Sequence, residues 1–233
     1  LRIDNFTLNG NVVALPGAAS NNSDIIDNTA PYSSTSPEFN SNPEYILFTD
    51  GSATTTGKII PMKFKIRDGG AGLNDADNLP TTLTGITFNV TNTSSTNRGN
   101  FIKRAIITTS GGTVIGTASS ITASQIIFTG LTDAAFTVAD NTETATNLHL
   151  RIAFDEANVI DNEKLVFTVA AATAGASGSQ FAAANAGGAQ TDSDNGNDRN
   201  RIEVIATALA FVQQPGNTGF GQTMTPNPTV HAI

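Results

Sequence analysis

The chain has 233 residues, which is enough for one large all-β domain or for two domains of ordinary size. Only 14% of the residues are charged, and a net charge of −8 argues against binding to nucleic acid or to an anionic membrane, since both need basic patches. The absence of cysteine excludes disulfides, thiolate nucleophiles and cysteine-ligated metal centres.

The first 43 residues are uneven in composition. Residues 1–8 alternate between polar and apolar side chains as a strand does, whereas residues 18–42 are rich in Ser, Asn, Thr and Pro. Ile25 and Ile26 are the only aliphatic pair in that second stretch. Such a composition is typical of a linker or a long surface loop. We therefore expect residues 1–43 to be the end of a preceding region plus a linker, in a chain that is a piece of a longer polypeptide.

Short strand-like segments separated by turn residues follow, from residue 44 to about residue 206. Residues 58–67 and 148–154 alternate most regularly, and Gly111-Gly112 has the form of a hairpin turn. The other expected strands are 83–90, 101–108, 113–115, 121–128, 136–138, 164–169 and 201–205. Residues 177–189 are rich in alanine but interrupted by glycine, which favours an irregular loop over a helix. This rhythm predicts one large Ig-like or Greek-key β-sandwich over residues 44–206, with little helix.

The last residues carry a specific pattern of apolar, glutamine, glycine and proline positions. The pattern consists of Leu209, Phe211, Gln214, Pro215, Gly221, Pro226, Pro228 and Val230. It resembles the opening of a bacterial immunoglobulin-like repeat, in which strand A is followed by a proline-marked A′ strand. The resemblance implies that residues 207–233 are the first strands of a following, truncated Ig-like module.

Shorter phrases in the body of the chain carry a related resemblance, over roughly residues 57–233. They are Phe64–Gly70, Asp75–Asp77, Leu83–Phe88, Asp161–Leu165 and Phe181–Ala189. These phrases resemble repeats of giant cell-surface adhesin-like proteins of Bacteroidota, which are type IX secretion substrates built from tandem Ig-like modules. The resemblance implies an extracellular, cell-surface location. The chain holds no second copy of the 44–206 unit, so the tandem repetition is implied by the resemblance alone.

Acidic residues gather directly after the expected strand 58–67. Asp68, Asp75 and Asp77 lie in a glycine-rich loop, where carboxylates and carbonyl oxygens can together surround a hard cation such as Ca²⁺. The alternative interpretation is a polar loop whose Asp and Asn side chains cap turns of their own backbone.

A second acidic segment precedes the expected strand 201–205. Asp192, Asp194 and Asp198 are spaced like ligands of an EF-hand, but Gly196 is at the fifth place instead of the sixth and no helices flank the loop. A non-helical calcium loop or a solvated turn both remain open. In multi-domain adhesins calcium often stiffens junctions between modules, and the resemblance therefore implies such a role here.

Catalytic motifs are missing from the sequence. His149 alternates with leucines on an expected strand, so it would face solvent or the opposite layer, and no Gly-x-Ser-x-Gly, phosphate-binding or dinucleotide-binding motif occurs. We expect a protein that is not an enzyme and has no catalytic residues.

The expected function is structural and adhesive. A stalk or fibre-forming segment of a secreted surface protein needs stable β modules, a soluble acidic exterior and short linkers, all of which are visible in the sequence. Its partners would be neighbouring modules, further copies in homotypic lateral or filament contacts, and a surface ligand. Two alternatives stay open: a carbohydrate-binding accessory module of an extracellular enzyme, which the lack of Trp makes less attractive, or a virion or tail-fibre structural protein.

Overall fold

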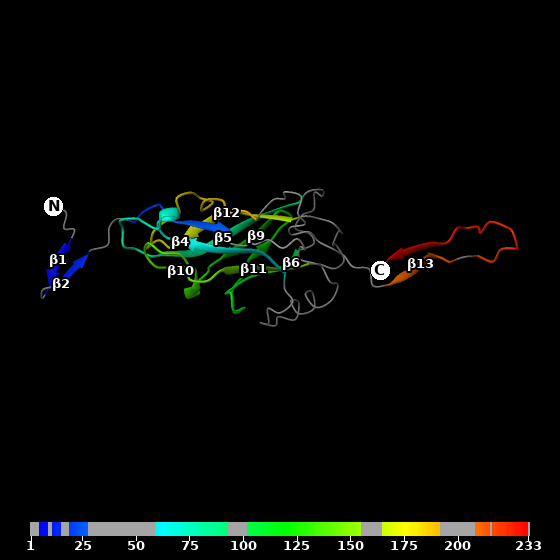
Figure 1. Cartoon of the computed structure of the whole chain (residues 1–233), viewed down its shortest axis with the longest axis horizontal. Coiled ribbons are helices and arrows are strands. Elements are labelled where there is room, and N and C mark those ends of the chain that lie inside the picture. Colours follow the sequence, from blue (N-terminus) through cyan, green and yellow to red (C-terminus); the bar gives the residue numbers. More distant parts are fainter. Residues whose placement is uncertain are drawn as a thin grey trace.

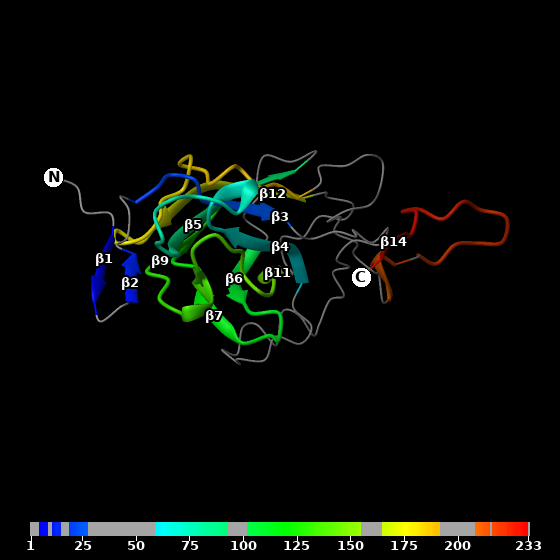
Figure 2. The same cartoon turned by 60° about the vertical axis from the view of Figure 1, so that its left-hand side comes forward.

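The computed structural model describes residues 5–8, 11–14, 19–27, 59–92, 102–154, 165–191, 208–214 and 216–232. These residues are mainly antiparallel strands, and their only helical segments are two 3₁₀ turns, η1 (Gly70–Gly72) and η2 (Ala134–Phe136). No helix in these ranges has the length and apolar character needed to cross a membrane. The predicted all-β class is confirmed, and two sheets form a sandwich (Figures 1 and 2).

The first sheet is organised around its longest strand, β5 (Thr81–Asn92). This strand pairs with β12 (Leu165–Ala174), β9 (Gln125–Thr129) and β10 (Thr137–Val138), while β8 (Ser120–Ile121) pairs with β9. The outer edge of β12 is covered by the irregular small-residue segment that precedes Thr191, for example by the bond from the Val169 amide to the Ala189 carbonyl at 2.8 Å. This segment is a loop, as the sequence predicts.

The second sheet has five strands in the order β3-β4-β11-β6-β7. They are β3 (Asp24–Asp27), β4 (Ile59–Arg67), β11 (Leu148–Phe154), β6 (Ile102–Thr108) and β7 (Val114–Thr117). A turn at Gly112, with a φ of 93°, joins β6 to β7 as the glycine pair predicts.

Aromatic side chains join the two sheets at the centre of the sandwich. Phe64 of β4 meets Phe88 of β5 edge to face, with 5.8 Å between ring centroids, and Phe88 meets Phe128 of β9 in the same manner at 6.1 Å. All three rings are completely or almost completely buried. The alternating apolar residues of each strand therefore form one core between the layers.

Three of the expected elements differ from the structure or lie outside the described residues. Residues 24–27, expected in the linker, form β3, which pairs with β4 along Asp24–Asp27. The sandwich therefore includes residues before the predicted boundary near residue 43. The expected strand 121–128 is a hairpin instead, because residues 122–124 turn between β8 and β9. The expected strand 201–205 lies outside the described residues.

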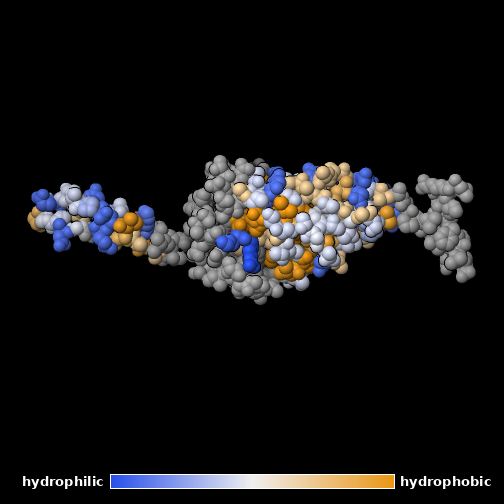
Figure 3. All heavy atoms as spheres, turned by 180° about the vertical axis from the view of Figure 1, so that it is seen from behind, coloured by the Kyte–Doolittle hydropathy of each residue, from blue (hydrophilic) through white to orange (hydrophobic). Residues whose placement is uncertain are grey.

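Two hairpins flank the sandwich in sequence. β1 (Asn5–Leu8) pairs with β2 (Asn11–Ala14), and β13 (Leu209–Gln213) pairs with β14 (Thr229–Ala232) (Figure 1). In the second hairpin Phe211 lies opposite Val230, and both side chains are exposed. Figure 3 shows hydrophobic atoms, in orange, on the surface of this hairpin at the left of the view. That this hairpin opens a following module stays a prediction.

The described chain enters the sandwich at one end and leaves it toward the other. Ser23 is hydrogen-bonded to Thr81, the first residue of β5, whereas the Thr191 amide donates to the carbonyl of Phe167, near the start of β12. β12 is antiparallel to β5, with Ala174 opposite Leu83. Phe167 therefore lies roughly seven residues of strand, or about 23 Å, from the end of the sandwich where Ser23 lies.

Candidate metal centre

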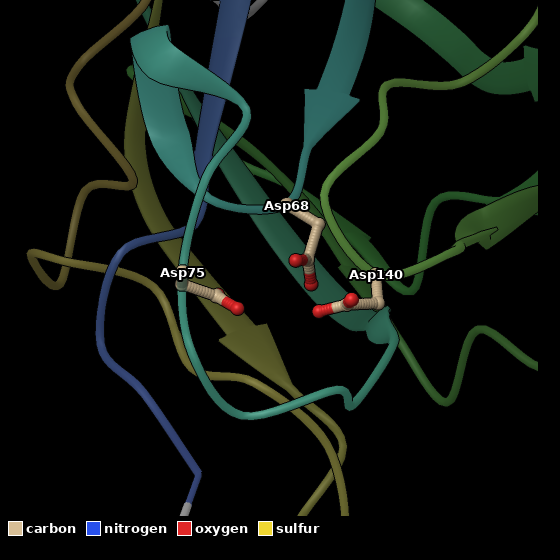
Figure 4. Close-up of side chains that lie close together, drawn as sticks. All are labelled: Asp68, Asp75 and Asp140. Atoms are coloured by element: carbon tan, nitrogen blue, oxygen red, sulfur yellow. The ribbon is translucent and has the colours of Figure 1, made fainter. Parts of the chain in front are cut away.

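Three carboxylates from separate segments converge at the end of the sandwich where the chain enters. Asp68 follows β4, Asp75 lies in the loop after η1, and Asp140 follows β10. One oxygen from each lies within 4.8 Å of the other two, and Figure 4 shows the three side chains pointing toward one another. The second sheet supplies the first aspartate and the first sheet supplies the third, so packing of the layers assembles the cluster.

The glycine-rich loop after β4 needs its glycine at the tightest point. Gly69 has a φ of 74°, and a Cβ there would collide with the backbone of Leu73 and Asn74. Only glycine adopts this conformation without strain while leaving room for the close approach. The tight turn brings Asp75 back toward Asp68 across the end of the sandwich.

Asp68 is completely buried and has two hydrogen-bond donors. Its Oδ2 accepts from the Thr81 hydroxyl at 2.6 Å, and its Oδ1 accepts from the Asn141 amide at 2.9 Å. Burial raises the pKa of Asp68 above its ordinary value, although both hydrogen bonds act in the opposite direction. Because the single hydroxyl proton of Thr81 is used on Asp68, the Ser23 hydroxyl must donate to Thr81, at 2.6 Å.

Asn141 connects all three carboxylates. Its amide donates to Asp68, its Oδ1 accepts from the amide of Asp75, and its Nδ2 donates to Asp140 Oδ2 at 2.9 Å. Its backbone has a φ of 56°, a left-handed conformation that asparagine tolerates better than most residues. The turn after β10 thus presents one backbone donor and one side chain to the cluster at the same time.

Asp140 has an oxygen that no described group satisfies. Its Oδ1 is buried and has no hydrogen-bond partner, while its Oδ2 is held by Asn141. Burial raises the pKa of Asp140, and the neighbouring carboxylate of Asp75 raises it further. An orphaned carboxylate oxygen beside two other carboxylates is a position that a cation or a proton would satisfy.

Asp77, also a predicted ligand, lies in a hydrogen-bond network beside the three converging carboxylates. Its Oδ2 accepts from the Ser20 amide and the Ser179 hydroxyl, both at 2.6 Å, and its Oδ1 accepts from the Leu79 amide at 2.7 Å. Burial alone would raise the pKa of Asp77, but these hydrogen bonds together bring it below its ordinary value. With three donors on its two oxygens, the side chain fastens two loops, and it lies outside the group of three converging carboxylates.

The cluster gathers negative charge without a basic partner in the described ranges. Two ion pairs in these ranges, Lys65–Glu143 and Arg67–Asp24, use other carboxylates. Hard cations such as Ca²⁺ bind oxygen ligands at about 2.3–2.6 Å, so one ion can bridge oxygens up to about 5 Å apart. The spacing of Asp68, Asp75 and Asp140 meets this limit, and the cluster could hold a metal ion.

The structure places the predicted ligand residues in three different ways. Asp68 and Asp75 come together as predicted, Asp77 lies beside them in its own network, and Asp192, Asp194 and Asp198 lie outside the described residues. Sequence reasoning missed Asp140 and Asn141. In the sequence these two residues are marked only as an Asp-Asn pair just after the expected strand 136–138. Nothing in that pair indicates a ligand until β10 pairs with the start of β5 and brings it to the cluster.

The histidine of β11 lies away from this cluster. Leu148 and Leu150 point into the core, so His149 points to the outer side of the second sheet, where it is nevertheless only 8% exposed. Burial, together with the nearby charges of Arg151 and Lys63, lowers the pKa of His149 to about 4. The side chain is therefore a buried neutral imidazole instead of the solvent-facing or core-facing residue expected from the alternation.

Comparison with known proteins adds no family to this description: no family model, no curated protein and no solved structure matches the chain.

Proposed function

We propose that this chain is a structural and adhesive segment of a long secreted surface protein, acting as a stalk or fibre-forming module. Neighbouring modules of the same polypeptide would be its first partners, and Ca²⁺ would stiffen the point where the chain enters the sandwich. In this role the module would hold neighbouring modules apart and present the binding ends of the protein. Both tasks require a stable β-sandwich that is attached to the rest of the polypeptide at its two ends.

The observation that carries the proposal is the path of the chain through the sandwich. The chain enters beside Ser23 and leaves beside Thr191, about 23 Å farther along the strands. Modules that are connected through opposite ends form an extended row. Modules whose two termini lie side by side make the polypeptide turn back on itself instead. Between these points the named strands pair antiparallel within two sheets that share one core, so we expect the module to resist extension as one body.

Calcium is supported by the chemistry of the cluster at the first of these two ends. Three carboxylates, each with an oxygen within 4.8 Å of an oxygen of the other two and one of them with an orphaned oxygen, form a hard-oxygen donor set that suits Ca²⁺. Ser20, in the segment leading into the sandwich, donates its hydroxyl to Asp75 at 2.6 Å. An ion held by Asp75 would therefore act directly on the junction.

The test of the mechanical function is imaging of the natural polypeptide that contains this chain. Negative-stain electron microscopy should show elongated particles in which this sandwich is one element of a row. A compact particle, or one that turns over a glycan or peptide substrate, would contradict the proposal.

The test for calcium is thermal unfolding of the chain with Ca²⁺ and with a chelator. A ligand at one hundred times its Kd stabilises the folded state by about 2.7 kcal/mol, which raises the Tm of a chain of this size by roughly 5–10 °C. Mg²⁺ serves as the matched control, because it demands a smaller and more regular oxygen shell. An identical Tm in calcium and in chelator would remove the ion from the proposal.

A further inference from the structure

The β12 strand lies at an edge of the first sheet. One side of β12 pairs with β5, without interruption from Leu165 opposite Asn92 to Val169 opposite Phe88. The strands of the first sheet, β5, β8, β9, β10 and β12, contain no Asp, Glu, Lys or Arg, and β12 also lacks proline and glycine. Charged residues and proline are common protections of a sheet edge against pairing with another chain. The stretch Leu165–Val169 has neither, and its Val, Phe and Thr residues favour extended strands.

Residues 180–191, which we name the edge guard, cover the other side of β12. The Val169 amide donates to the Ala189 carbonyl at 2.8 Å. Nearer the start of β12, the Thr191 amide donates to the Phe167 carbonyl at 2.9 Å. The edge guard is irregular, so it occupies hydrogen-bonding groups of β12 without adding a strand to the sheet.

The edge guard is also bonded to the entering segment, residues 20–25. The Gln180 amide donates to the Ser20 carbonyl at 2.7 Å, and the Ile25 amide donates to the Ala186 carbonyl at 2.8 Å. Ile25 is fixed in turn, because its side chain is buried in the core and its strand pairs with β4. The edge guard therefore lies between β12 and the entering segment.

A left-handed turn in the edge guard needs support from its surroundings. Ala186, Gly187 and Gly188 have φ values of 48°, 89° and 66°. Alanine is disfavoured in this conformation and keeps it only where the surrounding structure holds it there. The Ala186 side chain is completely buried, and its carbonyl accepts from the Ile25 amide. Withdrawal of the entering segment would remove this support.

We propose that the edge guard prevents β12 from pairing with another chain, and that the entering segment locks the edge guard in place. Withdrawal of residues 20–25 releases the edge guard and leaves backbone amides and carbonyls of Leu165–Val169 unpaired. The partner that this edge fits is β12 of a second copy, because two identical uncharged strands can pair antiparallel about a two-fold axis without opposing charges. The device requires neither calcium nor a neighbouring module, so its test is independent of the stalk function.

Hydrogen exchange and sedimentation equilibrium of the full chain with Gly187→Val test the device. A β-branched side chain is strained at a φ of 89°, and its Cβ would lie 3.5 Å from the Cβ of Asp24 in the entering segment. The variant should release the edge guard and speed hydrogen exchange at the Val169 amide by about tenfold. It should also associate with itself at least about tenfold more tightly than the natural chain.

A second change and a matched control separate edge pairing from general loss of structure. Thr168→Lys, added to Gly187→Val, places a lysine within the stretch Leu165–Val169, where the lysines of two copies would repel one another. This double variant should keep the fast exchange at Val169 and lose the association. The control is Gly130→Val, which strains another left-handed glycine, with a φ of 65°, on the opposite side of β5 from β12. It should change neither the exchange at Val169 nor the association.

Three outcomes would overturn the inference. They are unchanged exchange at Val169 in Gly187→Val, faster exchange without association, and association that Thr168→Lys does not reverse. If Gly187→Val does not fold, Ala182→Pro replaces it in both arms, because this change at an exposed position removes the amide that donates to the Ser23 carbonyl at 2.9 Å. None of these results depends on whether the natural polypeptide forms elongated particles.

Discussion

At the scale of single residues, the acidic cluster depends on one asparagine that organises three aspartates. Asn141 uses its left-handed backbone to donate its amide to Asp68, and its side chain to hold Asp75 and Asp140. Asp140 is left with a buried oxygen that no described donor reaches. The cluster therefore combines rigid positioning with unsatisfied negative charge, which is the combination that a cation site requires.

The first prediction concerns Asp140→Asn. Removal of one of three closely spaced carboxylates relieves repulsion, so the calcium-free variant should unfold at a higher temperature than the calcium-free natural chain. The same change removes a ligand, so addition of Ca²⁺ should raise its Tm by far less than the roughly 5–10 °C expected for the natural chain. Calorimetry in chelator and in calcium measures both effects. A variant that keeps the full calcium shift would show that Asp140 is not a ligand.

The second prediction concerns acid sensitivity and His149. The pKa of His149 lies near 4 in the folded chain and near 6.5 in the unfolded chain. The folded state thus binds the proton less readily, and its stability is complete above pH 6.5 and is lost as the pH falls toward 4. The shift corresponds to at most about 3 kcal/mol in the free energy of unfolding. Urea unfolding between pH 7 and pH 4 measures it, and His149→Gln should flatten the curve over this interval.

The matched control for acid sensitivity is His231→Gln, since His231 is exposed on β14. This variant should keep the pH dependence of the natural chain. If His149→Gln also keeps it, burial of the imidazole is not the source of the acid sensitivity.

At the scale of elements, the four-residue edge strand β3 is attached to the second sheet by an ion pair. The Arg67 guanidinium at the end of β4 donates from Nε to Asp24 Oδ1 at 2.7 Å and from a terminal nitrogen to Oδ2 at 2.5 Å. This bidentate bond raises the pKa of Arg67 above its ordinary value. The chain leading to β3 has a loop-like composition, so a specific side-chain contact adds to the four backbone pairings that hold the strand.

The third prediction is a double-mutant cycle with Asp24→Ala, Arg67→Ala and the combined variant. The coupling free energy should be about 1 kcal/mol, because the pair is bidentate and each side chain is about one-fifth exposed. The Lys65–Glu143 pair is the control, and its coupling should be smaller because its glutamate is 36% exposed. Chemical denaturation measures both cycles, and equal couplings in the two pairs would show that the bidentate geometry adds nothing.

Elements with strict alternation were predicted well from the sequence, and elements that depend on pairing were not. β4 and β11 follow the predicted segments closely, because one face of each strand must be apolar to join the core. β3 was missed because four residues with one aliphatic pair lack a local signal. Pairing with β4 and the bond from the Ile25 amide to the Ala186 carbonyl, at 2.8 Å, stabilise them as a strand. The split of the expected strand 121–128 into β8 and β9 likewise depends on a turn within an apolar run.

At the scale of the whole molecule, the candidate metal centre is also the attachment of the chain to the sandwich. Ser20 donates its hydroxyl to Asp75 and its amide to Asp77, and its carbonyl accepts from the Gln180 amide at 2.7 Å. Through Thr81, Ser23 reaches Asp68 in the same way. The segment entering the sandwich is thus bonded to two of the three converging carboxylates, directly or through one hydroxyl.

The fourth prediction concerns Ser20→Ala. The change removes the bond to Asp75 and leaves the backbone bond to Asp77, so the junction should open more readily while the sandwich stays folded. Loss of one hydrogen bond to a charged acceptor should speed hydrogen exchange at Gln180 by about tenfold, with no change at the core amides of β5. Ser119→Ala is the control, since Ser119 bonds Thr129 at the exposed edge of β9. Equal exchange at Gln180 in all three proteins would show that Asp75 does not hold the junction.

The amino-acid sequence by itself determined the all-β class, the main strands and the presence of Asp68 and Asp75 in a tight glycine loop, because these follow from side-chain periodicity and local backbone freedom. Tertiary structure alone decided that Asp140 and Asn141 join them, that Asp77 does not, and that one sheet carries no charged residue on its strands. The reason is physical: periodicity acts over neighbouring residues, whereas convergence depends on strand pairing between segments more than sixty residues apart, such as Asp75 and Asn141.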